Sequence, residues 1–277
     1  MSDTGIPVCH SPCRFGTLAR TMNKYWSFRH EELRLTARIN LHLIGFVLIL
    51  ISQQCTSSEL PLGLGGSISW TSDYVFRGVS QSQNLPAIQA EVHVQPVEHW
   101  VVGAWASTLH LLPSTHSTEI NPYVGHQWTI NQDWNLNITG THYQYLNDPR
   151  SVSYNYDELS LSTQWADTIF ARVAWSPNTN LYQYSGYRYY ENQQTLTIEG
   201  GYHAPLPWKL DAQIGAGLYL PLELHQGRYA YGSAGITRQF GSIQLELNYF
   251  WVQSKEHRIF NQWNAGTPWV VAVQWQF

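Results

Sequence analysis

Apolar and polar side chains alternate along several stretches of this chain. The clearest is residues 208–220, where each second residue from Trp208 to Leu220 is apolar, and residues 87–96 and 243–251 show the same pattern. Successive side chains of a strand point to opposite faces, so each stretch predicts a strand with one apolar and one polar face. The seven apolar positions of 208–220 fit the roughly 9–11 tilted residues with which a strand crosses a bilayer.

Less regular strands bring the expected total to about twelve. They cover residues 66–76, 100–110, 119–130, 134–145, 156–165, 168–176, 190–203, 229–240 and 268–277. The connections alternate between short links, such as 97–99 and 241–242, and longer polar ones, such as 77–86 and 254–267. This rhythm predicts an all-β fold, a transmembrane up-and-down antiparallel β-barrel with short periplasmic turns, long external loops and both termini in the periplasm.

The end of the chain favours the outer membrane of a bacterium. Its last nine residues place an apolar side chain at every odd position and finish on an aromatic: Trp269, Val271, Val273, Trp275 and Phe277. This ending resembles the signal by which outer-membrane barrels are recognised for assembly, so we expect the barrel-assembly machinery and outer-membrane lipid as partners.

Tryptophans close to the expected short turns or chain ends indicate an interfacial girdle: Trp100, Trp128, Trp134, Trp165, Trp175, Trp208 and Trp275. The alternative is a soluble β-sandwich or lipocalin-like barrel, whose aromatics fill a core. It fits less well, because a soluble barrel hides its apolar face inside and seldom needs so many long strands.

Residues 1–58 differ in chemistry from residues 59–277, which we assign to the barrel. The first segment holds six Lys/Arg against three Asp/Glu and then runs into the apolar stretch 41–51. That order predicts a cleaved export signal, because a stretch of eleven residues is too short for a membrane helix, which takes roughly 20. Met22 is an alternative start, so where the leader begins stays open.

Cysteine and charge exclude several function classes. All three cysteines lie in the leader, and Cys9 and Cys13 have no second ligand pair at a fitting spacing, so we expect no metal and no cofactor. Without the leader's six bases and three acids, nine Lys/Arg and sixteen Asp/Glu remain, a formal charge of −7. A nucleic-acid partner is therefore not expected.

One internal string resembles a known family. Residues 72–82 read Ser-Asp-Tyr-Val-Phe-Arg-Gly-Val-Ser-Gln-Ser, followed by Pro-Ala-Ile-Gln at 86–89 and Gly-Ala-Trp-Ala-Ser at 103–107. The string resembles the start of the mature part in the proteobacterial porin-type family TorF, also called Gcw-chp. The likeness is strong over residues 66–107 and general beyond them. It implies an outer-membrane β-barrel whose transported solute is poorly defined.

Within this string, Asp73 and Arg77 have the same strand parity. We expect both to face the lumen at the outer end of the first strand, with Gly78 allowing the backbone to turn. Two interpretations stay open. The pair either anchors a neighbouring loop, which is the more ordinary reading, or Arg77 borders the entrance of a pore.

Charged residues of inward parity predict a hydrated lumen, since such groups are costly against hydrocarbon. The candidates are Glu91, His93, Glu158, Arg172, Glu199, Lys209, Asp211 and Glu246. Their five carboxylates against two bases favour cations weakly. The leading hypothesis is thus a porin-like channel for passive diffusion of small hydrophilic solutes. The alternatives are a barrel that presents its loops and, less favoured, an outer-membrane lipase or protease. No His-x-Ser and no Gly-x-Ser-x-Gly occurs, so we expect no enzyme.

Overall fold

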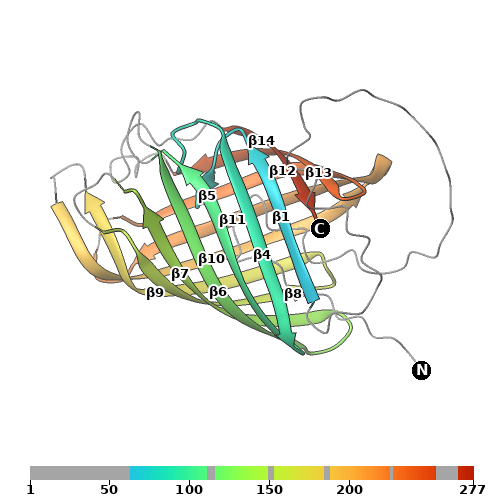
Figure 1. Cartoon of the computed structure of the whole chain (residues 1–277), viewed down its shortest axis with the longest axis horizontal. Helices are drawn as coiled ribbons and strands as arrows, with labels where there is room; N and C mark the ends of the chain where they lie inside the picture. The colour runs from blue at the N-terminus through green and yellow to red at the C-terminus, as the bar shows by residue number, and fades with distance from the viewer. Residues whose placement is uncertain (1–62, 111–115, 149–152, 184–187, 225–226, 254–267) are drawn as a thin grey trace, which may run out of the picture.

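The computed structural model describes residues 63–110, 116–148, 153–183, 188–224, 227–253 and 268–277. The leader 1–58 lies outside them. Twelve strands form one closed antiparallel barrel, as the sequence predicts (Figure 1). They are β1 (Gly63–Thr71), β4 (Ala87–Val97), β5 (Trp100–Leu109), β6 (Ser117–Thr129), β7 (Trp134–Leu146), β8 (Tyr156–Trp165), β9 (Ile169–Gln183), β10 (Arg188–Leu206), β11 (Leu210–Pro221), β12 (Tyr229–Phe240), β13 (Ile243–Val252) and β14 (Trp269–Gln276).

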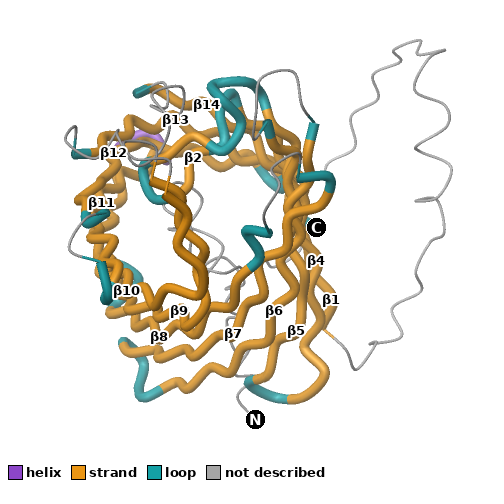
Figure 2. Tube along the Cα trace, turned by 90° about the vertical axis from the view of Figure 1, so that its left-hand side faces the viewer, coloured by secondary structure: helices purple, strands orange, loops and turns teal. Residues whose placement is uncertain are grey.

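Neighbours around the barrel are neighbours along the chain, and β14 closes the ring against β1 (Figure 2). In this seam Ser67 lies opposite Gln276 and Trp70 opposite Val273. The last residue extends the pairing, because the Phe277 and Gly66 backbones exchange two N–H···O bonds of 3.0 Å. A closed barrel leaves no open sheet edge, so the strands satisfy one another's backbone groups.

The barrel is apolar outside and polar inside. Along β4, the Ile88 side chain is 51% exposed on the outer surface, whereas Gln89, Glu91 and His93 are buried. The same alternation runs along β13, where Leu245 and Leu247 are exposed and Gln244, Glu246 and Asn248 are buried. An outer surface of this kind suits hydrocarbon, whereas a soluble barrel would reverse the two faces.

The two ends of the barrel differ. We call the end with the connections 98–99, 130–133, 166–168 and 241–242, together with the 3₁₀ turn η3 (Pro207–Lys209), the short-turn end. The other is the long-loop end. Exposed tryptophans mark both: Trp100, Trp128, Trp134, Trp165, Trp208 and Trp275 at the short-turn end, and Trp70, Trp251 and Trp269 at the long-loop end. Trp175 is not beside a short turn, because it pairs with Leu159 in the long-loop half of the wall.

Several strand limits differ from those expected. β1 ends at Thr71 rather than at residue 76. β9 and β10 continue through most of the expected loop 177–189, with register shifts between Tyr190 and Thr195. The ends of these two strands at the long-loop end lack the apolar alternation, which is why the sequence pattern predicts a loop there. β11 begins after η3, which contains Trp208 and Lys209 in left-handed conformation.

Within the residues that the structure describes, no helix is both long enough and apolar enough to cross a membrane.

Candidate functional site

A small hairpin follows β1 and enters the barrel. It spans residues 73–82 and contains β2 (Val75–Phe76) and β3 (Val79–Ser80), which pair in antiparallel fashion. The two turn residues between them, Arg77 and Gly78, have φ values of 51° and 78°. Two successive residues with positive φ form the tight turn that matches the twist of a hairpin. Glycine also gives space here, since a Cβ on Gly78 would lie 2.8 Å from Cβ of Tyr231.

Polar side chains at the base of the hairpin hold its two arms together. The hydroxyl groups of Ser80 and Ser82 donate to the carboxylate of Asp73, at 2.6 and 2.8 Å. The Tyr74 amide donates to Ser82 Oγ at 2.9 Å, and the Asn84 amide donates to Ser80 Oγ at 3.0 Å. The base is therefore closed by bonds among residues 73–84.

The hairpin packs against much of the inner wall. Val79 belongs to a buried cluster with Tyr219, Tyr229, Tyr231 and Leu181, from strands β9, β11 and β12. On the other side, Val75 clusters with Phe250 and Val270 of β13 and β14. Tyr74 clusters with Trp105 and Leu109 of β5, and its ring centroid lies 5.4 Å from that of Trp105. These contacts on several sides place the hairpin across the barrel interior.

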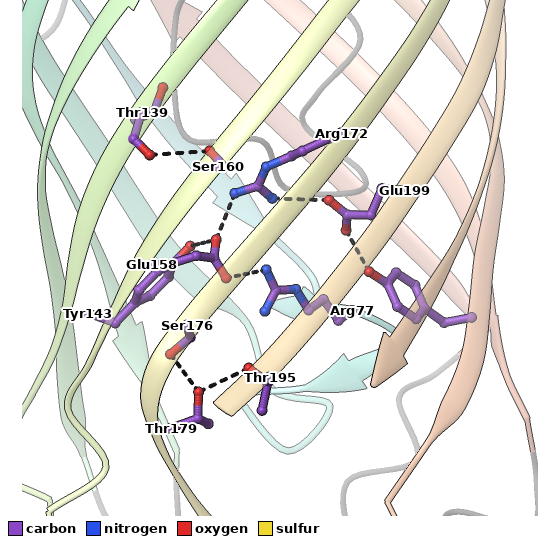
Figure 3. A network of polar contacts seen from close by, with 11 residues as sticks. Arg77, Thr139, Tyr143, Glu158, Ser160, Arg172, Ser176, Thr179, Thr195 and Glu199 are labelled. Carbon is purple, nitrogen blue, oxygen red and sulfur yellow. Dashed lines mark hydrogen bonds and ion pairs between the residues drawn. The ribbon is translucent and has the colours of Figure 1, made fainter. Parts of the chain in front are cut away.

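The tip of the hairpin joins a chain of buried charges (Figure 3). Arg77 Nη2 lies 2.6 Å from Glu158 Oε2 of β8. Arg172 of β9 bridges the same glutamate at 2.7 Å and Glu199 of β10 at 3.0 Å. The chain ends at Tyr231 of β12, whose hydroxyl donates to Glu199 at 2.6 Å. Two guanidinium groups thus balance two carboxylates between the hairpin and four strands.

These charges are nearly sealed from water. Arg77 is 4% exposed, Arg172 2%, and Glu158 and Glu199 4% each. An arginine guanidinium stays charged in folded proteins, and the nearby Glu158 carboxylate balances the charge of Arg77. The hairpin therefore carries a fixed positive charge into the barrel. Undocking of the hairpin would break the Arg77–Glu158 ion pair, so this charge-assisted contact favours the docked hairpin.

Other acids of the interior are held by neutral donors. The Tyr123 hydroxyl donates to Glu91, which also lies 3.2 Å from His93 Nδ1. Glu119 accepts bonds from Tyr74 at 3.1 Å and from Asn121 at 2.7 Å. The amides of Gln244 and Asn248 donate to Glu246, the second at 3.2 Å. Among the described residues, the buried charged groups are Asp73, Glu91, Glu119, Glu158, Glu199, Glu246, Arg77 and Arg172, together with His93.

The structure places the residues that the sequence singled out as follows. Glu91, His93, Glu158, Arg172, Glu199 and Glu246 are buried inside the barrel. Asp211 is half-buried at the short-turn end, 3.4 Å from His203 Nε2. Lys209 differs from the expectation, because it lies in η3 and is exposed instead of facing the interior from a strand. The apolar residues of the last strand, Trp269, Val271, Val273, Trp275 and Phe277, are exposed on the outer surface.

Asp73 and Arg77 do not continue the first strand as expected. Both belong to the hairpin, and they have separate partners: Asp73 binds the serines of its base and Arg77 binds the far wall. The segment that was expected to anchor a loop is thus a separate hairpin inside the barrel. Glu119 was missed in the sequence, although its alternation with Ile120 in β6 places it on the same face as Asn121 and Tyr123.

Within the described part of the chain, no group of three or more His, Cys, Asp or Glu side chains could hold a metal ion.

A closed barrel with an apolar exterior and a charged interior defines a protein of the transmembrane β-barrel class. Within it, the chain belongs to the Gcw_chp family, whose model is described as a bacterial protein of unknown function and matches residues 55–276. A search among curated proteins found no match.

Several solved barrels are similar in overall shape at very low identity. The KdgM porin is 8% identical, with a TM-score of 0.47 and coverage of 77% of this chain and 99% of that one. The NanC porin is 9% identical, with a TM-score of 0.46 and coverage of 76% and 98%. OmpF of Salmonella typhi, in complex with daunomycin, is 9% identical, with a TM-score of 0.38 and coverage of 78% and 97%.

Proposed function

We propose that this protein is a porin-like channel of the bacterial outer membrane that lets small hydrophilic solutes diffuse passively. The observation that carries the proposal is a closed twelve-stranded barrel that is apolar outside and polar inside, the reverse of a soluble barrel. Its outer face matches lipid, and its inner face is lined with carboxylates, guanidinium groups, amides and hydroxyl groups that suit a polar path. The exposed tryptophans at both ends fit the two membrane interfaces.

The export and assembly of the barrel belong to the same proposal. The basic and apolar leader would direct the chain out of the cytoplasm as an export signal. The terminal strand, with its aromatic last residue, would then be recognised by the barrel-assembly machinery. Recovery of the chain in outer-membrane fractions, with its amino terminus near Glu59, would support this route. A mature protein that retains residues 41–51 would contradict it.

A weak preference for cations is the finer part of the proposal. The buried groups of the described interior comprise six carboxylates and two guanidinium groups, a formal charge of −4 with His93 taken as neutral. A negative lumen raises the local concentration of cations and lowers that of anions. Bonds between the acids and their neighbours moderate this field, so the preference should be small.

Planar-bilayer recording of the purified protein tests the channel directly. We expect discrete conductance steps and, in a salt gradient, a reversal potential of the sign that cation passage gives. Absence of conductance from both the intact protein and a variant that lacks the hairpin would overturn the proposal.

One observation favours a second function, a barrel that serves mainly to present its loops. Many interior side chains are buried, and the hairpin packs against several strands at once. A barrel filled in this way passes no solute unless part of the filling moves. The recording on the variant without the hairpin separates the two functions.

A further inference from the structure

The hairpin 73–82 is a unit that is closed by its own bonds. Asp73 ties the two arms through Ser80 and Ser82, whichever wall the hairpin faces. Its flanks are short connections to the barrel. On one side, Ser72 exchanges bonds with Val271, at 2.9 Å from its amide and 3.0 Å through its hydroxyl. On the other side, Gln83 and Asn84 both have positive φ, 55° and 62°, so the chain bends sharply there.

The contacts between the hairpin and the wall are of three kinds, and one of them is the hydrogen bond from the Tyr74 hydroxyl to Glu119. Most are apolar or aromatic, such as Val79 against Tyr231 and the Phe76 ring 6.0 Å from the Tyr143 ring. At the tip, the contact is the ion pair of Arg77 with Glu158. Apolar contacts are non-directional, whereas the charged pair fixes one position of the tip.

The wall keeps its own bonds if the tip withdraws. Glu158 would still be held by Arg172 at 2.7 Å and by the Tyr143 hydroxyl at 3.3 Å, and Arg172 would still bridge Glu199. Departure of Arg77 therefore leaves Glu158 with two donors, and Glu199 keeps Arg172. It changes the charge of the central group from neutral to −1, because two carboxylates then face one guanidinium group.

We propose that the hairpin is a tethered plug, that Arg77 and Glu158 form its latch, and that the hairpin must leave its site before the barrel conducts freely. This inference rests on the proposed channel function. The open barrel is then wider and more negative at its centre than the closed one. In the closed barrel the docked hairpin blocks the passage of solutes. In the open barrel the hairpin has withdrawn, and the Arg77 guanidinium group lies in water.

The test uses two variants and one matched control in the full-length protein. Arg77→Gln removes the charge of the latch, and replacement of residues 73–82 by a short glycine linker removes the plug. Arg238→Gln is the control, because Arg238 lies on the outer face over the Phe240 ring, at 4.7 Å. We expect Arg77→Gln to raise the equilibrium ratio of open to closed barrels roughly tenfold or more, the factor that the loss of one charged hydrogen bond corresponds to. The linker variant should conduct at the open level throughout.

A chemical measurement reports the movement without any conductance. Val79→Cys, made with Cys9, Cys13 and Cys55 replaced by serine, places a thiol in the buried contact between the hairpin and the wall around Tyr231. A membrane-impermeant thiol reagent should label it faster when Arg77→Gln is added, and no faster when Arg238→Gln is added. Equal labelling in all three backgrounds would overturn the latch, and equal conductance of the linker variant and the conducting intact protein would overturn the plug. If no protein conducts but labelling still depends on Arg77, the channel function fails and the latch stands.

Discussion

Tyrosine hydroxyl groups hold much of the negative charge of the barrel interior. Tyr231 donates to Glu199, Tyr123 to Glu91, Tyr143 to Glu158 and Tyr74 to Glu119. These four acids sit on different strands, so the pattern recurs around the wall. A phenol reaches further than a serine and carries no charge, so it can stabilise an acid without cancelling its field.

Glycines of the wall give these large side chains their space. A Cβ on Gly217 would lie 2.5 Å from the Tyr231 ring, and one on Gly103 would lie 2.5 Å from the Tyr123 hydroxyl. In the sequence, an inward glycine such as Gly217 indicates room for solutes. In the fold, the neighbouring strand uses that room for a tyrosine.

Gly78 offers a prediction at the residue scale. Gly78→Ala places a methyl group 2.8 Å from Cβ of Tyr231 at a φ of 78°, so we expect the hairpin to leave its site. Gly241→Ala is the matched control, with a φ of 58° and nothing within 4 Å; it should cost only about 1 kcal/mol of backbone strain.

Limited trypsin digestion distinguishes the two glycine variants, because Arg77 is a cleavage site that the docked hairpin buries. Mass spectrometry should detect fragments that end at Arg77. In Gly78→Ala they should form roughly tenfold faster than in the intact protein or in Gly241→Ala, because trypsin cleaves this site only after local opening. Equal cleavage of both variants at Arg77 would show that a methyl group at position 78, close to Tyr231, does not displace the hairpin.

At the scale of elements, the strands of the wall could be predicted and the hairpin could not. β4 and β13 show strict alternation because one face meets an apolar exterior and the other a polar interior. The hairpin 73–82 lies inside the barrel and is buried on both sides, so Tyr74, Val75 and Val79 follow no period of two. The resemblance of residues 72–82 to a known family singled out this segment, but it did not indicate a hairpin inside the barrel. The contact of Arg77 with β8 depends on residues 81 positions apart, which no local pattern reveals.

The terminal strand carries a prediction about assembly. Phe277 is half exposed, its ring centroid lies 5.1 Å from that of Trp275, and its bonds to Gly66 are made by backbone atoms. Phe277→Ala should therefore cost the finished barrel only about 1 kcal/mol, less than a fully buried phenylalanine. In cells, we expect a much larger loss of assembled protein, because we propose that the barrel-assembly machinery recognises the aromatic end.

Phe277→Tyr is the control for this prediction, since it keeps the ring at the chain end. Assembled protein is counted on gels by the faster migration of unheated barrels, and stability is measured after refolding in detergent. Equal assembly of Phe277→Ala and intact protein in cells would contradict the recognition role. A large loss of stability after refolding would shift the role to packing.

At the scale of the whole molecule, the distribution of charge decides which ions the barrel favours. The central chain of Arg77, Glu158, Arg172 and Glu199 is neutral as long as the hairpin is docked. The excess of negative charge therefore comes from the acids outside that chain, among them Glu91 and Glu246. These two lie on β4 and β13, on either side of the β1–β14 seam, so their field acts on the same side of the lumen.

Neutralising these two acids should weaken the preference for cations. We expect Glu91→Gln combined with Glu246→Gln to move the reversal potential in a salt gradient toward zero. Glu98→Gln should leave it unchanged, because Glu98 is 73% exposed in a short turn. The preference of the intact protein should also shrink as salt rises, since the screening length falls from about 10 Å at 0.1 M to about 3 Å at 1 M. An anion preference in the intact protein, or an equal shift from Glu98→Gln, would show that the acids of the interior do not set the selectivity.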